Sequence, residues 1–192
     1  SVYIHPVGGQ FKLDDMKTLL DELDKCKNAS IRLAMTEGIF IINLDGKEAE
    51  KMLEISKPFS GCTSLEKSVS CIGVPICQMG IANSQKMLHE IIDYFKENSN
   101  GDDTILNAMP RIHISGCMNS CGVHQIGAIG LTGKKKKVDG EMHDAFGIFV
   151  NGELGLGKTR LGESLGDFKA CDIPKFLFEI GEKVANSDLD FY

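Results

Sequence analysis

The spacing of apolar and polar residues predicts an ordered series of short strands and helices at the start of the chain. Residues 2–7 alternate loosely between apolar and polar side chains and end in a Gly-Gly turn, which is typical of a short strand. Residues 13–23 carry apolar side chains at helical spacing, which predicts an amphipathic helix. Two β-rich runs and a short helix are expected next, over residues 30–34, 39–44 and 47–55. The predicted order is therefore β-α-β-β-α.

A second series of elements is predicted beyond residues 56–70, an aperiodic stretch that indicates a domain boundary. A helix is expected after Cys77, because one apolar face is formed by Ile81, Ser84, Met87, Leu88, Ile91, Ile92 and Phe95. Strands are predicted over residues 111–115, 126–131 and 145–151. The last helix is expected to begin near Asp172 as its N-cap, with Pro174 in its first turn.

The composition excludes several classes of protein. The chain has 192 residues, of which 42% are hydrophobic and 25% charged, enough for one good core or two small ones. Its formal net charge of −6 argues against a general nucleic-acid binder, which is normally basic. No apolar run approaches the roughly 20 residues that span a bilayer, and the first residues do not match a signal peptide. We therefore expect a cytoplasmic protein with neither a nucleic acid nor a membrane as partner.

The cysteines carry the strongest chemical signal. Cys71 and Cys77 form one pair and Cys117 and Cys121 a second, each in a glycine-containing stretch that favours turns. Four thiolates suit tetrahedral zinc or an iron–sulfur cluster. Structural zinc usually has two to four residues between paired cysteines, whereas five and three separate them here, so a cluster is favoured. A disulfide scaffold is not expected from seven unevenly spaced cysteines, and free or buried thiols are expected for the others: Cys26, Cys62 and Cys171.

These cysteines lie in a pattern that resembles the sirohaem and [4Fe–4S] domain of the nitrite and sulfite reductase family. The pattern is C-x5-C, a helix, a strand and then S-G-C-x-N-S-C-G, and the similarity continues through residues 126–133. The resemblance implies that the cluster is bound by Cys71, Cys77, Cys117 and Cys121. It also implies that Cys121 bridges to the sirohaem iron and that Asn119 donates or accepts a hydrogen bond close to the cofactor.

The predicted fold class is α+β. Residues 1–56 are similar to the ferredoxin-like half-domain of the same family, and residues 57–192 are expected to form an α/β cluster domain with a mixed sheet. Arg32 stands at the Arg of the family's I-R-L-T pattern, although Ala34 replaces the usual Thr and Glu37 the usual Gln. Arg32 is therefore interpreted either as a sirohaem carboxylate contact or as a solvated strand residue.

Three further candidates follow from the pattern of residues after the second cysteine pair. His124 is a candidate proton donor or carboxylate partner. Residues 152–159 match the phosphate-loop pattern G-x-x-x-x-G-K-T, but the glycines that follow argue against the helix that such a loop requires. A glycine-rich turn of the reductase family is the better interpretation, with Lys158 and Arg160 as candidate contacts of the sirohaem periphery.

Four consecutive lysines, residues 134–137, are predicted to form a solvated turn after the strand at residues 126–131. A second interpretation is that their charge steers an anionic partner, either the carboxylates of sirohaem or an acidic electron donor such as ferredoxin.

The resemblance implies the six-electron reduction of sulfite to sulfide or of nitrite to ammonia, at sirohaem coupled to a [4Fe–4S] cluster. The electron donor is expected to be ferredoxin-like or another protein. Full-length members of the family contain two half-domains, whereas this chain shows one, so it is expected to be the C-terminal part of a longer reductase or a small single-repeat form. The alternative is an iron–sulfur module for electron transfer or redox sensing that binds no sirohaem, and a structural zinc domain is the third possibility.

Overall fold

The computed structural model describes residues 1–187, which divide into two compact units. The first unit is Ser1–Cys62, and the second begins at Thr63. The division falls inside the aperiodic stretch at residues 56–70, after the last helix of the first unit.

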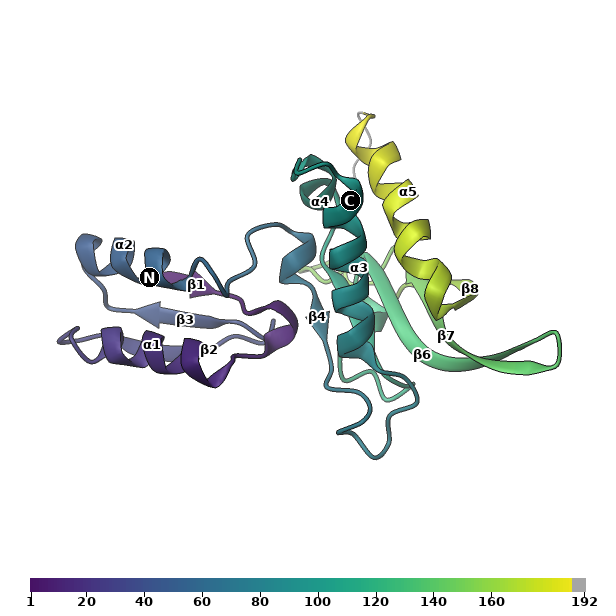
Figure 1. Cartoon of the computed structure of the whole chain (residues 1–192), viewed down its shortest axis with the longest axis horizontal. Coiled ribbons are helices and arrows are strands. Elements are labelled where there is room, and N and C mark those ends of the chain that lie inside the picture. The colour runs from purple at the N-terminus through teal and green to yellow at the C-terminus, as the bar shows by residue number, and fades with distance from the viewer. Residues whose placement is uncertain (188–192) are drawn as a thin grey trace. The chain divides into compact units, whose positions relative to one another are not determined.

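The first unit has the predicted β-α-β-β-α order. Its elements are β1 (Val2–Ile4), α1 (Leu13–Leu23), β2 (Ser30–Leu33), β3 (Ile39–Ile42) and α2 (Gly46–Ser56). The strands form an antiparallel sheet in the order β1-β3-β2, which Figure 1 shows in purple and blue. The core is made by side chains from both strands and helices, namely Val2, Ile4, Leu19, Ile39, Ile41 and Met52. Helix α2 begins with a capping box, in which Asp45 and Glu48 satisfy each other's backbone N–H groups.

The second unit is built on a five-stranded mixed sheet in the order β4-β5-β6-β7-β8. The strands are β4 (Val69–Ser70), β5 (Ile112–Ser115), β6 (Ile129–Val138), β7 (Glu141–Val150) and β8 (Glu163–Lys169). The pairings of β4 with β5 and of β5 with β6 are parallel, and the remaining two are antiparallel. The α+β class with a mixed sheet is confirmed.

Three helices complete the second unit: α3 (Ser84–Asn98), α4 (Thr104–Ala108) and α5 (Ile173–Ala185). Helix α3 lies where the apolar face predicted it, and α5 begins after Asp172 with Pro174 in its first turn. Helices α3 and α5 lie side by side in Figure 1, and the rings of Phe95 and Phe178 pack edge to face with centroids 5.1 Å apart. Phe95 is fully buried, so this contact belongs to the core of the unit.

The lysine run was assigned wrongly to a turn. Residues 134–137 continue β6, which starts at Ile129 and pairs with β7 along its whole length. The lysines tolerate the strand because acidic groups lie beside them: Lys134 pairs with Asp167 at 2.6 Å, and Lys135 pairs with Asp144 directly opposite. The predicted strand start at Ile126 was also wrong, because the short 3₁₀ helix η3 (His124–Ile126) occupies that position.

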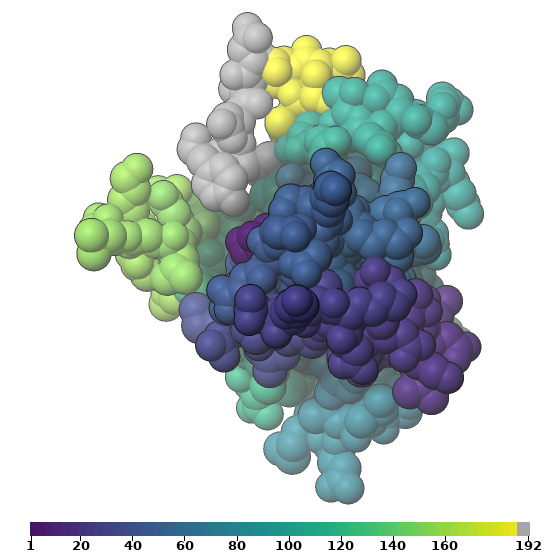
Figure 2. Space-filling view, turned by 90° about the vertical axis from the view of Figure 1, so that its left-hand side faces the viewer, coloured from purple at the N-terminus to yellow at the C-terminus, as the bar shows by residue number. Residues whose placement is uncertain are grey.

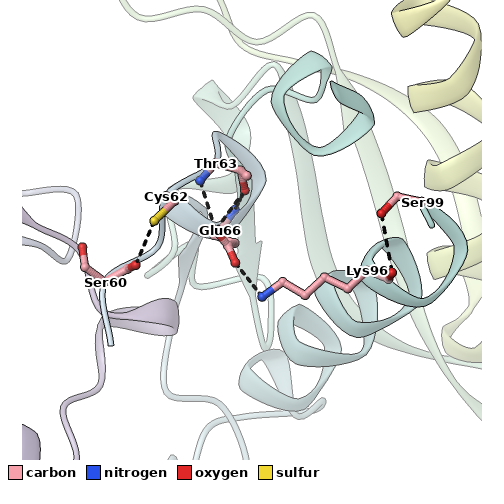
Figure 3. Close-up of polar contacts among 6 residues, drawn as sticks. All are labelled: Ser60, Cys62, Thr63, Glu66, Lys96 and Ser99. Atoms are coloured by element: carbon pink, nitrogen blue, oxygen red, sulfur yellow. Dashed lines mark hydrogen bonds and ion pairs between the residues drawn. The ribbon is translucent and has the colours of Figure 1, made fainter. Parts of the chain in front are cut away.

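The start of the second unit is fixed by a buried carboxylate (Figure 3). Glu66 lies in the 3₁₀ helix η2 (Leu65–Lys67), and its Oε2 accepts hydrogen bonds from the backbone N–H of Thr63 at 3.0 Å and from the Thr63 hydroxyl at 3.2 Å. Its Oε1 forms an ion pair with Lys96 of α3 at 2.6 Å. The Glu66 side chain is 12% exposed and the Lys96 side chain 52% exposed. The carboxylate therefore loses more of its hydration than the ammonium group does.

Removing this carboxylate is therefore expected to cost more than removing its partner. Glu66→Ala leaves the Thr63 donors unsatisfied and should lower the free energy of unfolding by about 1–3 kcal/mol. Lys96→Met keeps both Thr63 bonds to the carboxylate and should cost less than Glu66→Ala, because Lys96 is half-exposed and water can approach its place. Urea unfolding of the two variants beside the unchanged chain measures both values. A loss in Lys96→Met equal to that in Glu66→Ala would contradict this assignment.

Candidate metal centre

The fold brings the two cysteine pairs to one edge of the mixed sheet. Strand β4 ends immediately before Cys71, and β5 ends two residues before Cys117. Because β4 and β5 are parallel, with Ser70 opposite Ile114, their carboxyl ends lie at the same edge. This edge is the place where open α/β sheets usually bind ligands. The loops that carry the cysteines therefore meet there, although many residues separate them in the sequence.

All four cysteines line one cavity of about 100 Å³. We call residues 71–77 the first cysteine loop and residues 117–121 the second. Asn119 and the backbone of Gly73, Gly80 and Gly116 complete much of the lining. Cys71, Cys77 and Cys117 are half-buried, whereas Cys121 is exposed. Within residues 1–187, no three His, Cys, Asp or Glu side chains are grouped closely enough to hold a metal ion.

Cys71 is held by donors from two other segments. The backbone N–H of Gly116 donates to Cys71 Sγ at 3.1 Å, which ties the second loop to the first. The hydroxyl of Ser84, the first residue of α3, lies 3.3 Å from the same sulfur and donates to the Cys71 carbonyl oxygen at 2.6 Å. Ser84 is fully buried. The Gly116 N–H is a donor aimed at the sulfur, and such donors stabilise the thiolate form that binds metals.

The backbones of the two loops pack too closely for side chains at two glycines. The carbonyl oxygen of Gly116 accepts hydrogen bonds from the N–H groups of Ile81 and Ala82, both at 2.9 Å. A Cβ at Gly116 would lie 2.7 Å from the Ala82 carbonyl oxygen. Gly73 has a φ of 55°, in the left-handed region that glycine adopts without strain. These glycines let the loops approach each other beside the cavity.

The two histidines near the second loop lie outside the cavity lining. His124 is fully buried, its Nδ1 lies 2.9 Å from Ser115 Oγ, and its ring packs against Phe149. Within the part of the chain that the structure describes, its Nε2 has no hydrogen-bond partner. Burial, and secondarily the charge of His113, lower the pKa of His124. Burial is also the main cause that lowers the pKa of His113, against a hydrogen bond to the Gly122 carbonyl that raises it.

The other predicted contacts of the cofactor lie elsewhere. Lys158 and Arg160 belong to the segment between β7 and β8, which projects as a separate yellow-green lobe in Figure 2. Arg160 is engaged there, since it donates to the Asn151 carbonyl at 2.8 Å and pairs with Glu153 at 3.6 Å. Strand β8 follows this segment, so the helix that a phosphate loop requires is replaced by a strand. Arg32 is an exposed residue of β2 in the first unit.

Two of the four lysines in the run are paired with acidic side chains. Lys134 and Lys135 pair with Asp167 and Asp144, and Lys136 donates to the Asp167 carbonyl oxygen at 2.6 Å. Paired lysines produce a weaker field than the four free charges that the sequence indicated. The run is therefore a weaker candidate for steering an anionic partner.

Among residues 1–187, no helix has both the length and the apolar character needed to cross a membrane.

Comparison with curated proteins finds similar reductases. The ferredoxin–nitrite reductase of Synechococcus elongatus is 27% identical over 185 residues, which cover 93% of this chain and 35% of that protein. The sulfite reductase [NADPH] hemoprotein beta-component of Bacillus licheniformis is 30% identical over 131 residues, covering 63% of this chain and 22% of that protein. The assimilatory ferredoxin-dependent nitrite reductase of Haloferax mediterranei is 27% identical over 152 residues, 77% of this chain and 25% of that protein.

The fold has a counterpart among solved structures. The structure of Mycobacterium tuberculosis NirA protein superposes on 99% of this chain and 36% of its own with a TM-score of 0.85, at 17% sequence identity. No family model matches the chain. The chain thus spans about a third or less of the length of these relatives, and it shares the fold of the matching part of NirA.

Acidification is predicted to destabilise the second unit through the buried His124 and the half-buried His113. Their folded-state pKa values are lowered, so below about pH 6.5 the unfolded chain binds protons that the folded chain excludes. The free energy of unfolding, fully present above that pH, should fall as pH decreases through the lowered pKa values. Urea unfolding between pH 7 and pH 5 should show a shallower fall in His124→Gln, with exposed His89→Gln as the control. Parallel profiles for all three proteins would contradict this expectation.

Proposed function

The chain is a homologue of the nitrite and sulfite reductases over most of its length, and we propose that it carries the part of such an enzyme that binds a [4Fe–4S] cluster and sirohaem. The reaction proposed is the six-electron reduction of sulfite to sulfide or of nitrite to ammonia. One observation carries this proposal: four cysteines from two distant loops line a single cavity. Four sulfurs are the donor set that a [4Fe–4S] cluster takes.

The proposed ligands of the cluster are Cys71, Cys77, Cys117 and Cys121. The Gly116 N–H donates to the Cys71 sulfur before any metal arrives, and the Ser84 hydroxyl holds the Cys71 carbonyl oxygen. Hydrogen bonds to ligand sulfurs and restricted solvent access both tune the potential of a cluster. The half-buried state of the first three cysteines fits that role.

Cys121 is proposed to have a second role as the bridge to the sirohaem iron. It is the exposed member of the four, so its sulfur is accessible to a group outside the cavity as well as to the cluster. Asn119 lines the same cavity and supplies an amide beside the sulfurs. When bound, the cluster supplies electrons one at a time and the sirohaem iron holds the substrate anion.

Two exposed cations remain candidate contacts of the sirohaem carboxylates. Lys158 is exposed on the lobe between β7 and β8, and Arg32 is exposed on β2. Arg160 is a poorer candidate because Glu153 and the Asn151 carbonyl already hold its guanidinium. His124 is proposed to support the site from the core, because its ring is fully buried and lies outside the cavity lining.

The electron donor is proposed to be ferredoxin-like or another protein. The names of two similar nitrite reductases specify ferredoxin, and that of the similar sulfite reductase specifies NADPH. A ferredoxin delivers single electrons directly, whereas NADPH gives up two electrons as a hydride and needs a flavin carrier to pass them one at a time to a cluster.

An absorption spectrum with iron and sulfide analysis tests this proposal, on protein purified without oxygen from cells that make sirohaem. We expect sirohaem bands and about five irons per chain, four from the cluster and one from sirohaem. Cys121→Ser should abolish the sirohaem bands and most of the iron, because it removes the proposed bridge. The matched control is Cys171→Ser, an exposed cysteine outside the cavity, which should keep both.

Three results would overturn parts of the proposal. Cluster absorption without sirohaem bands would indicate an iron–sulfur module for electron transfer or redox sensing. An iron-free chain would remove the four cysteines as the site, and a Cys121→Ser variant that retains both cofactors would remove Cys121 as the bridge.

A further inference from the structure

The second cysteine loop is closed by contacts that do not involve its cysteines. We propose that Ser115 and His113 are positioning residues that clamp Gly122 onto β5 and so hold Cys117 and Cys121 in place. The inference rests on the proposed function only in assigning these thiols to a cluster. The clamp itself is a feature of the chain without cofactor.

Ser115 holds the backbone N–H of Gly122. Its Oγ accepts this hydrogen bond at 3.1 Å and lies 2.9 Å from Nδ1 of His124. A hydroxyl group has one proton and two lone pairs, so Ser115 can hold the Gly122 N–H and also either donate to or accept from His124 Nδ1. Ser115 is 1% exposed and His124 is fully buried, so water does not replace these bonds when one is lost.

His113 holds the carbonyl group of the same glycine. Its Nδ1 lies 3.1 Å from the Gly122 carbonyl oxygen, and since a carbonyl only accepts, the imidazole donates. His113 and Ser115 are two residues apart on β5 and therefore point to the same face of the sheet. Between them, the Ile114 carbonyl oxygen lies so close to Gly122 that any Cβ there would collide with it.

Three consecutive strand residues thus fix one glycine. The loop leaves β5 after Ser115 and returns to β5 at Gly122, so the clamp closes a short ring of backbone that contains both cysteines. A closed loop has already lost much of the conformational entropy that ligand binding would otherwise require. Residues locked by supporting hydrogen bonds hold metal ligands more accurately than a free loop does.

Ser115→Ala tests the clamp, and Ser68→Ala is its matched control. Ser68 is also a buried serine whose Oγ accepts a backbone N–H of β5, that of Ile112 at 2.9 Å, but at the opposite end of the strand. Both variants lose the same kind of buried bond, so a general loss of stability affects both. Only Ser115→Ala should release the second cysteine loop.

Two measurements on the cofactor-free full chain report the position of the loop. Exchange of the Gly122 amide hydrogen, followed by NMR, should become roughly tenfold faster in Ser115→Ala, as for loss of one buried hydrogen bond. Alkylation of Cys117 and Cys121 by iodoacetamide, followed by peptide mass spectrometry, should accelerate in the same variant. Both rates should stay unchanged in Ser68→Ala.

A third measurement reports the consequence for the cofactor. After reconstitution with iron and sulfide, the cluster absorption of Ser115→Ala should decay several-fold faster in air than that of Ser68→Ala. If Ser115→Ala does not fold, His113→Phe takes its place, and His113→Gln, which keeps a donor for the Gly122 carbonyl, should restore slow exchange.

Equal exchange and alkylation rates in Ser115→Ala and Ser68→Ala would overturn the clamp. An unchanged chain that takes up no cluster would overturn the proposed function instead. In that case the exchange and alkylation rates of the cofactor-free chain still test whether Ser115 and His113 hold Gly122 in place.

Discussion

The parallel pairing of β4 with β5 is the constraint on which the candidate site depends. Parallel strands end at the same edge of a sheet, so the residues that follow each of them become neighbours. Here those residues are the two cysteine loops. Strand β5 has a central role because it pairs with β4 and β6, leads into the second cysteine loop and carries the side chains that close it. A substitution that distorts β5 would therefore displace all four thiols together.

Much of the fold follows from the local spacing of apolar and polar residues in the sequence. The helices α1, α3 and α5 have apolar faces at regular spacing, and their positions were predicted correctly. Strand β8 was missed because Gly166, with a φ of 123°, and a register shift opposite Ile148 and Phe149 interrupt its alternation. The lysine strand was missed for another reason. Its stabilising acid Asp167 is distant in the sequence, and local patterns carry no record of such a partner.

The candidate site, like the fold, was predicted from the sequence only in part. The four cysteines were predicted to form one site, and a strand was predicted before the second pair. Strand β4, before the first pair, was missed because the residues around it show no periodic pattern. The structure brings the four cysteines to one cavity. Their role as ligands is still a prediction. The supporting bonds were not foreseeable, because Ser84, Ser115 and Gly122 are ordinary residues in the sequence. Only the tertiary structure shows that each makes a specific contact with a cysteine or with the backbone of a cysteine loop.

The central claim is that one cluster is shared by thiols from both cysteine loops. Native mass spectrometry of the full chain after anaerobic reconstitution with iron and sulfide tests it most directly. The account predicts a single added mass of four irons and four sulfides, and its absence when Cys77 or Cys117 is replaced by Ser. A chain that remains at its unmodified mass, or one that keeps the added mass in both variants, would contradict it.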